Sequence, residues 1–147
     1  KAGPPLEGKD LHIGDFANGI LPPAAPLTTA TLTLAGMALA FWRDGSGRIV
    51  VSFIGEGGSS LGEWHEAINL CAARKLPAIF CVENNQTALS TPLADQSAVR
   101  VFADKAAGYG VPGITVDGTD TEQIAAAYTL ADEREREGQG TTLIESI

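Results

Sequence analysis

The sequence of 147 residues is poor in basic side chains, with ten Lys and Arg against 18 Asp and Glu and a net charge of −8. Its cations are scattered and form no basic run, which argues against nucleic acid as a partner. Cysteine is also scarce. Cys71 and Cys81 lie in apolar contexts without metal-ligand spacing, so we interpret both as buried reduced thiols.

A long hydrophobic run and an apolar leader are missing as well. The start, KAGPPLEGKD, is polar and unlike a signal peptide. The longest uncharged stretch, residues 16–42, is interrupted by prolines, threonines and glycines, whereas a membrane span needs roughly 20 consecutive apolar residues. We therefore expect a cytoplasmic protein of bacterial type with no membrane partner. Because the sequence starts without Met, we also expect it to be a fragment of a longer chain.

Apolar patterning predicts an α/β fold. Two continuous apolar runs rich in β-branched residues, 48–54 and 76–83, are typical of strands covered on both faces. The alternation of strands and helices indicates one domain over residues 1–147, built as a doubly wound, mostly parallel sheet flanked by helices. The other expected strands are 113–117 and 142–147, and the expected helices are 28–42, 97–109, 121–137 and one that begins near residue 60.

Two S/T-x-x-E patterns predict capping boxes at helix starts, Ser60 with Glu63 and Thr119 with Glu122. The helix after Ser60 carries an apolar stripe of Leu61, Trp64, Ile68 and Cys71. The run DEREREG, residues 132–138, is interpreted as a solvated helix face.

Neither histidine is assigned to chemistry. We expect His65, next to the apolar stripe, to pack or form a hydrogen bond, and we give His12 no functional role.

A glycine-rich turn with a single acid follows the first predicted strand. It reads Gly55-Glu56-Gly57-Gly58, and the next strand along the chain ends in Glu83-Asn84-Asn85. In open parallel sheets, ligands bind beyond the carboxyl ends of the strands. Both strand ends are therefore candidates for a binding site.

Three ligand classes compete for this turn. A Walker loop requires a lysine after its last glycine, and no lysine occurs between Arg48 and Arg74. A dinucleotide fingerprint requires a third glycine where the chain has Ser60, and Glu83 lies 28 residues after Gly55 rather than about 20. A diphosphate held through a divalent cation fits better, because such cations take oxygen ligands from one or two protein groups and from phosphate.

The residues for such a site are present at both strand ends. Glu56 offers a carboxylate, Asn85 an amide oxygen and Thr87 a main-chain carbonyl. Backbone N–H groups of Gly57 and Gly58, at the start of a helix, suit phosphate oxygens.

The spacing of these motifs is that of a thiamin diphosphate signature, G-(D/E)-G followed by N-N, with 26 residues between Gly57 and Asn84. The stretch GEGGSSLGEWHEAINLCAARKLPAIFCVENNQTALSTP resembles the alpha subunit of the decarboxylating first component of 2-oxo acid dehydrogenase complexes (pyruvate, branched-chain and acetoin types). Further similarity runs through GKDLHIGDFANGILPPAAPL, DKAAGYGVPGITVDGTD and EREGQGTTLIES.

The resemblance implies that Mg²⁺ is bound by the side chains of Glu56 and Asn85 and by the carbonyl of Thr87. It also implies contacts to the cofactor from Gly57 and Gly58 at the diphosphate and from Gly55 and Leu27 at the aminopyrimidine. Most members have Asp in place of Glu56, although the branched-chain type has Glu, and many have Tyr in place of Thr87. Neither change removes the oxygen that would bind the metal.

The resemblance implies oxidative decarboxylation of a 2-oxo acid, with acyl transfer to a lipoyl-bearing acyltransferase component. In this family the glutamate that activates the cofactor belongs to a pyrimidine-binding module, on a beta subunit or a fused segment. A His-bearing loop follows the position where this sequence stops. We therefore assign no catalytic residue here and expect the chain alone to be inactive. The alternatives are a transketolase-like, acetolactate-type or acetoin-type thiamin diphosphate enzyme, or a non-catalytic nucleotide-binding module.

Overall fold

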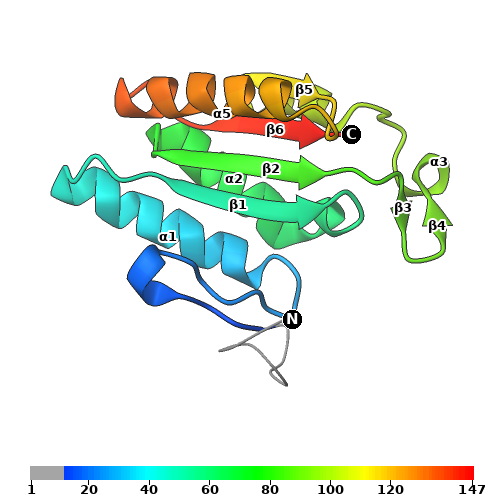
Figure 1. The fold of residues 1–147 in the computed structure, drawn as a ribbon, viewed down its shortest axis with the longest axis horizontal. Coiled ribbons are helices and arrows are strands. Elements are labelled where there is room, and N and C mark those ends of the chain that lie inside the picture. The colour runs from blue at the N-terminus through cyan, green and yellow to red at the C-terminus, as the bar shows by residue number, and fades with distance from the viewer. Residues whose placement is uncertain (1–11) are drawn as a thin grey trace.

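The computed structural model describes residues 12–147, and its centre is a four-stranded parallel sheet (Figure 1). The strands run in the order β1-β2-β6-β5. Their bounds are β1 (Val50–Gly55), β2 (Ala78–Glu83), β5 (Gly113–Val116) and β6 (Thr142–Ser146). All four predicted strands are thus confirmed, with ends shifted by up to two residues.

Three long helices flank the sheet, α1 (Thr29–Asp44), α2 (Gly62–Arg74) and α5 (Thr121–Arg136). The shorter elements are η1 (Phe16–Asn18), η2 (Gly58–Ser60), α3 (Leu93–Gln96), η3 (Phe102–Lys105), α4 (Ala106–Tyr109) and the hairpin β3 (Thr87–Ala88) with β4 (Thr91–Pro92). No helix within residues 12–147 is both long and apolar enough to cross a membrane.

Helices lie on both faces of the sheet, and β2 is buried from Ala78 to Val82, as its continuous apolar run predicts. The same prediction is wrong for β1, where burial alternates along the strand and Phe53 is 57% exposed. On one face α1 and α2 pack against β1 and β2, where Trp64 meets Phe80 edge to face with ring centroids 5.4 Å apart. On the other face α5 packs over a smaller cluster that includes Ile79 and Ile144. The doubly wound α/β fold is therefore confirmed.

The strand register brings three strand ends to one edge of the sheet. Gly55 of β1 lies beside Glu83 of β2, and Glu83 lies beside Ser146 of β6. The glycine turn after β1 and the Asn84-Asn85 segment after β2 therefore start side by side. The hairpin β3–β4 projects from the same end of the molecule (Figure 1).

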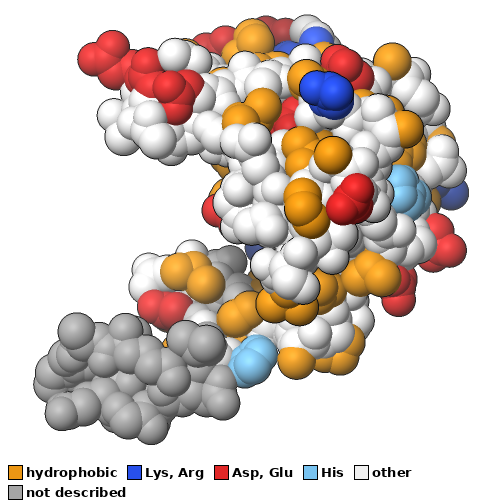
Figure 2. Space-filling model, turned by 90° about the vertical axis from the view of Figure 1, so that its right-hand side faces the viewer, with side chains coloured by type: hydrophobic (Ala, Val, Ile, Leu, Met, Phe, Trp, Pro, Cys, Tyr) orange, Lys and Arg blue, Asp and Glu red, His pale blue; other side chains and the backbone are white. Residues whose placement is uncertain are grey.

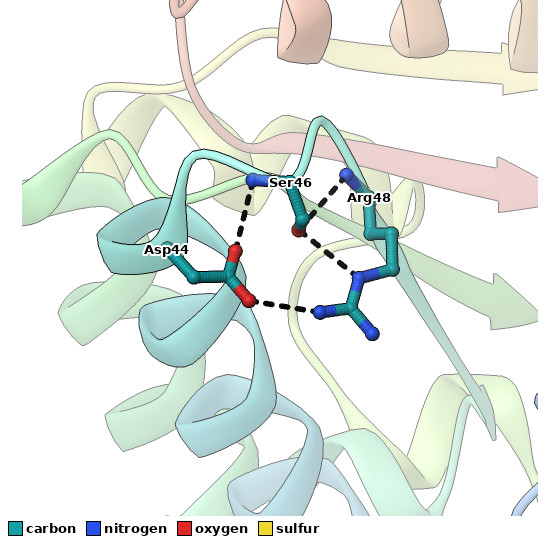
Figure 3. Close-up of polar contacts among 3 residues, drawn as sticks. All are labelled: Asp44, Ser46 and Arg48. Atoms are coloured by element: carbon teal, nitrogen blue, oxygen red, sulfur yellow. Dashed lines mark hydrogen bonds and ion pairs between the residues drawn. The ribbon is translucent and has the colours of Figure 1, made fainter.

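At the opposite end, a short turn joins α1 to β1 (Figure 3). Gly45 ends α1 in the left-handed conformation at φ 63°, and Asp44 accepts a hydrogen bond from the Ser46 N–H at 2.9 Å. Arg48 closes the turn with an ion pair to Asp44 at 2.8 Å. Because both charged side chains are well exposed, this ion pair contributes little to the stability of the protein.

The capping boxes predicted for α2 and α5 are wrong. Ser60 belongs to η2 and does not precede α2 directly. The N-cap residue of α2 is Leu61, whose side chain forms no capping hydrogen bond. Glu63 accepts a hydrogen bond from the Thr28 hydroxyl instead. For α5 the cap is Asp120, whose carboxylate accepts from the N–H groups of the second and third helical residues.

The helix predicted over residues 97–109 is also wrong in its first half. Residues 97–101 are not helical, and a 3₁₀ turn and one turn of α-helix follow, η3 and α4. The reason lies at Ala103, whose N–H donates to the carboxylate of Glu145 at 2.9 Å. In a helix from residue 97 that N–H would donate to the carbonyl of Val99.

The apolar stripe of α2 is confirmed for Trp64, Ile68 and Cys71, which are buried, whereas Leu61 is exposed. Cys71 and Cys81 are both buried free thiols, as predicted.

The solvated face predicted for residues 132–138 is exposed at Glu133 and from Arg136 to Gly138, half-buried at Asp132 and Arg134, and buried at Glu135. One carboxylate oxygen of Glu135 accepts the Ala78 N–H at 3.2 Å, at the point where β2 begins.

Candidate functional site

The turn between β1 and α2 packs too tightly for any residue but glycine at two positions. A Cβ on Gly57 would lie 2.4 Å from the Cβ of Ala88 in the hairpin. A Cβ on Gly58 would lie 2.8 Å from side-chain atoms of Ile54. Glycine is the default residue where backbones must approach this closely. The turn thus forms a close-packed backbone cradle beneath the β3–β4 hairpin.

Glu56 is buried inside this cradle, with 1% of its surface exposed. Its Oε1 accepts a hydrogen bond from Gln96 Nε2 at 3.2 Å. Among residues 12–147 the ion pairs found join Arg48 to Asp44 and Arg136 to Asp132, so no cation there neutralises Glu56. Burying a carboxylate is costly unless it is paired, well hydrogen-bonded or bound to a metal. With one hydrogen-bond donor found within residues 12–147, Glu56 is a candidate ligand for a cation.

Asn85 and Thr87 lie at the neighbouring strand end and are exposed. The Oδ1 of Asn85 accepts the Thr87 N–H at 3.0 Å, which closes a turn of the kind that Asx side chains favour. The hydrogen bonds of the structure link Asn85 to Thr87 and Glu56 to Gln96, and none joins Glu56 to Asn85. The sequence thus predicts correctly that Glu56 and Asn85 lie at one edge of the sheet, but it does not predict their hydrogen-bond partners, Gln96 and Thr87.

Asn84 is buried and holds the turn in place. Its Nδ2 donates to Glu145 Oε1 at 2.8 Å, its Oδ1 accepts the Gln86 N–H at 2.9 Å, and its own N–H donates to the Ser146 carbonyl. Glu145 was missed. The sequence does place this acid within the apolar run of the last strand, TLIES, and a buried acid at such a position needs a hydrogen-bond or charge partner.

Leu27 reaches the turn from the segment before α1. Its Cδ1 lies 3.5 Å from the position that a Gly58 Cβ would take, and the side chain is 53% exposed. The next residue, Thr28, has a left-handed backbone (φ 70°) and donates from its hydroxyl to Glu63 at 3.1 Å. This contact ties the start of α1 to the start of α2 beside the cradle.

His65 forms a hydrogen bond with a residue outside the glycine turn, in agreement with the role predicted for it. Its Nδ1 forms a hydrogen bond with the hydroxyl of Tyr109, and the two rings are tilted at 32°. Burial and the nearby Lys105 lower the pKa of His65, which favours the neutral ring. No observation links it to the glycine turn.

The chemistry at this edge is that of oxygen ligands and backbone donors. No group of three or more His, Cys, Asp and Glu that would bind a metal occurs among residues 12–147. A cation at Glu56 would therefore need amide, carbonyl, water or ligand oxygens beside that carboxylate. Figure 2 looks onto this end of the molecule and shows mostly uncharged surface across its middle.

Two cavities are found among the described residues. One of about 230 Å³ is lined by Arg48 and Glu135 at the opposite end of the strands. The other, of about 380 Å³, lies between α5 and the sheet and reaches Glu83 and Ser146 at the carboxyl ends of β2 and β6. Neither is lined by Glu56, so neither encloses a ligand at the glycine turn.

The residues predicted for the site thus lie at one edge of the sheet. Gly55, Glu56, Gly57, Gly58 and Leu27 meet around the first turn, while Asn85 and Thr87 follow the adjacent strand. Gln96, in the four-residue helix α3, was missed, and no sequence pattern singles it out.

Known proteins match most of this chain. The family model of the dehydrogenase E1 component matches residues 3–147. The chain is 40% identical over 148 aligned residues to the 2-oxoisovalerate dehydrogenase subunit alpha of Bacillus subtilis, which is 99% of this chain and 45% of the relative. It is 40% identical to the pyruvate dehydrogenase E1 component subunit alpha of Staphylococcus aureus, over 90% of this chain and 36% of that one. The chain thus spans less than half the length of these curated relatives.

Solved structures share the fold. A mutant transketolase from Pichia stipitis superposes with a TM-score of 0.69 at 24% identity, over 88% of this chain and 21% of its own. A Mycobacterium smegmatis protein described as a thiamin diphosphate-dependent enzyme gives a TM-score of 0.64 at 24% identity, over 86% of this chain and 23% of its own. At this identity the superpositions establish the fold alone. The family model and the identities to the alpha subunits go further, and by them the chain belongs to the dehydrogenase E1 component family.

Proposed function

We propose that residues 1–147 are the thiamin diphosphate-binding domain of a 2-oxo acid dehydrogenase first component, and that this domain binds Mg²⁺ and the cofactor's diphosphate. The observation that carries the proposal is the buried carboxylate of Glu56, which no cation within residues 12–147 neutralises. A metal-bridged diphosphate accounts for an acid inside a glycine turn, where a diphosphate alone would be repelled.

The ligand set follows from the strand ends. Mg²⁺ is bound through a few protein oxygens together with phosphate oxygens and water. Glu56 would supply the carboxylate, Asn85 its amide oxygen and Thr87 its carbonyl. Because Asn85 Oδ1 accepts the Thr87 N–H, this hydrogen bond already holds the two residues together in one turn.

The cradle would hold the diphosphate. Gly57 and Gly58 present backbone without side chains, and the N-termini of η2 and α2 follow at once. N–H groups at such starts favour anions. Gly55 and Leu27 flank the turn and would contact the aminopyrimidine side.

When bound, thiamin diphosphate supplies the carbanion chemistry of decarboxylation, and the protein supplies position and charge. This chain's residues would neutralise the diphosphate and anchor the cofactor. The group that activates the cofactor would come from a beta subunit or a fused pyrimidine-binding module, and the acyl product would pass to a lipoyl-bearing acyltransferase component. We therefore propose that this chain turns over no 2-oxo acid alone.

The names of the relatives support this assembly, because each is called a subunit alpha. They span both 2-oxoisovalerate and pyruvate dehydrogenases, so the proposal commits to the 2-oxo acid class. A transketolase-like enzyme shares the fold but is not favoured by the family match.

A thermal-shift series on the full-length protein, co-expressed with its pyrimidine-binding partner, tests the proposal. Thiamin diphosphate with Mg²⁺ should raise the melting temperature, and NAD or ATP should not. Glu56→Ala should remove the Mg²⁺-dependent part of the shift, and the matched control Glu133→Ala, on the exposed face of α5, should keep it. Stabilisation by NAD or ATP, without any by the cofactor, would favour the nucleotide-binding module instead.

A further inference from the structure

Gln96 makes the one hydrogen bond found to the carboxylate of Glu56 within residues 12–147. It is the last residue of α3, after the β3–β4 hairpin. Its Nε2 donates to Glu56 Oε1 at 3.2 Å and to the main-chain carbonyl of Thr91 at 2.7 Å. One side chain therefore links the acid of the glycine turn to the hairpin.

The chemistry of these partners fixes the orientation of the amide. A carboxylate and a carbonyl both accept hydrogen bonds, so only the NH₂ end of Gln96 can face them. The other end, Oε1, is thereby left over. It is buried and has no hydrogen-bond partner.

This unpartnered oxygen lies at the cradle. It is 3.5 Å from the position that a Cβ on Gly57 would take, where the turn packs beneath the hairpin. A buried acceptor without a donor is destabilising, and in native proteins such atoms are rare enough to need an explanation. Gln96 Oε1 therefore faces a place where a hydrogen-bond donor is missing.

We propose that Gln96 is a positioning residue of the metal site, an inference that rests on the proposed function. Its Nε2 holds the Glu56 carboxylate in the orientation that binds the cation, and its Oε1 accepts a hydrogen bond from a water molecule of the hydrated cation. Mg²⁺ retains several waters in such sites. A neutral amide suits this task because it orients the carboxylate without competing for its charge.

A purely structural tie between the hairpin and the turn is the competing explanation, and it makes a different prediction. A tie would stabilise the fold equally with and without metal. Partners that orient metal ligands, in contrast, change metal affinity by 10- to 100-fold when they are lost.

The test is the dissociation constant of Mn²⁺, a spectroscopic substitute for Mg²⁺, measured by electron paramagnetic resonance. It is made on the full-length protein with its partner module at saturating thiamin diphosphate. Gln96→Met, of similar length, should raise this constant by roughly 10- to 100-fold. Gln139→Met, in the exposed loop after α5, should leave it within twofold. An unchanged constant in folded Gln96→Met would overturn the inference.

Gln96→Glu keeps the inference testable if the Met variant does not fold. It retains an acceptor at the Oε1 position but places a second carboxylate against Glu56. The melting temperature should fall without divalent metal and recover when Mg²⁺ and cofactor are added. A loss that Mg²⁺ does not restore would support the structural tie. Absence of metal-dependent cofactor binding in the wild-type protein would instead refute the proposed function itself.

Discussion

Glu145 of β6 accepts a hydrogen bond from the side chain of Asn84, which follows β2, with Nδ2 and Oε1 2.8 Å apart. Its second oxygen, Oε2, accepts the Ala103 N–H at 2.9 Å. Both partners are donors, so a carboxylate is the group that satisfies them together. This fully buried acid fixes the first asparagine of the pair from which the proposed metal ligand projects.

Glu145→Gln should therefore destabilise the protein although it is nearly isosteric. An amide places an NH₂ group against one of two donors, and leaving a buried donor unpaired costs about 1–3 kcal/mol. Urea unfolding of the variant measures this loss, with Glu133→Gln on the exposed face of α5 as the matched control. Equal stability of both variants would show that Glu145 does not hold the turn.

Gly57→Ala should lower the stability of the protein far more than Gly62→Ala. A Cβ at Gly57 meets Ala88 at 2.4 Å, whereas a Cβ at Gly62 has no atom of its surroundings within 4 Å. Overpacking of this kind costs about 1–3 kcal/mol and would push the hairpin away from the cradle. Gly62→Ala, in the first turn of α2, should be neutral or stabilising by up to about 1 kcal/mol.

Denaturant unfolding and cofactor titration of both variants check this prediction. Gly57→Ala should lose cofactor affinity as well as stability, and Gly62→Ala should lose neither. A Gly57→Ala protein with wild-type values in both measurements would contradict the close packing of the turn.

Glu135 should make the stability of the protein fall as the pH rises. Burial raises the pKa of Glu135 to about 8 from 4.5, against the opposing effects of the Ala78 N–H and Arg134. Because the folded state holds the proton more tightly, its contribution is complete below about pH 4.5 and is lost as the pH rises to about 8.

Glu135→Gln removes this titration and keeps an oxygen for the Ala78 N–H. Its unfolding free energy should exceed that of the wild type by roughly 2–4 kcal/mol at alkaline pH, and the difference should shrink toward acid pH. Glu137→Gln, exposed two residues further on, should show no such trend. A pH-independent difference for Glu135→Gln would refute the assignment.

Both cysteines should resist thiol reagents in the folded protein. Burial raises the pKa of Cys71 to about 12 and also raises that of Cys81, so little thiolate exists near neutral pH. Labelling with a chromogenic disulfide reagent should be slow in native buffer and should reach both thiols in denaturant. Rapid native labelling at either position would show that its strand or helix is open to solvent.

Much of the fold could be predicted because its strands are continuous apolar runs. Residues 48–54 and 76–83 became the neighbouring strands β1 and β2, and their register placed the two polar strand ends together. The site residues of the first turn could be predicted for the same reason, since Gly55 must be followed by the turn at the carboxyl end of a buried strand.

The rest depended on contacts between distant residues. The helix expected from residue 97 was wrong because Glu145, 42 residues after Ala103, accepts the N–H that such a helix would use. The tie between Gln96 and Glu56 joins residues 40 positions apart and leaves no local pattern. Ser60 failed as a cap because the tight turn of η2 delays the start of α2.

Calorimetric titration of thiamin diphosphate tests the central claim most directly. It is done with and without Mg²⁺, on the folded chain alone and with its pyrimidine-binding partner, for the wild type and Glu56→Gln. We predict binding that requires Mg²⁺, tightens with the partner and is lost in Glu56→Gln. Absence of binding to folded wild-type protein in every condition, or Mg²⁺-dependent binding that survives in Glu56→Gln, would contradict it.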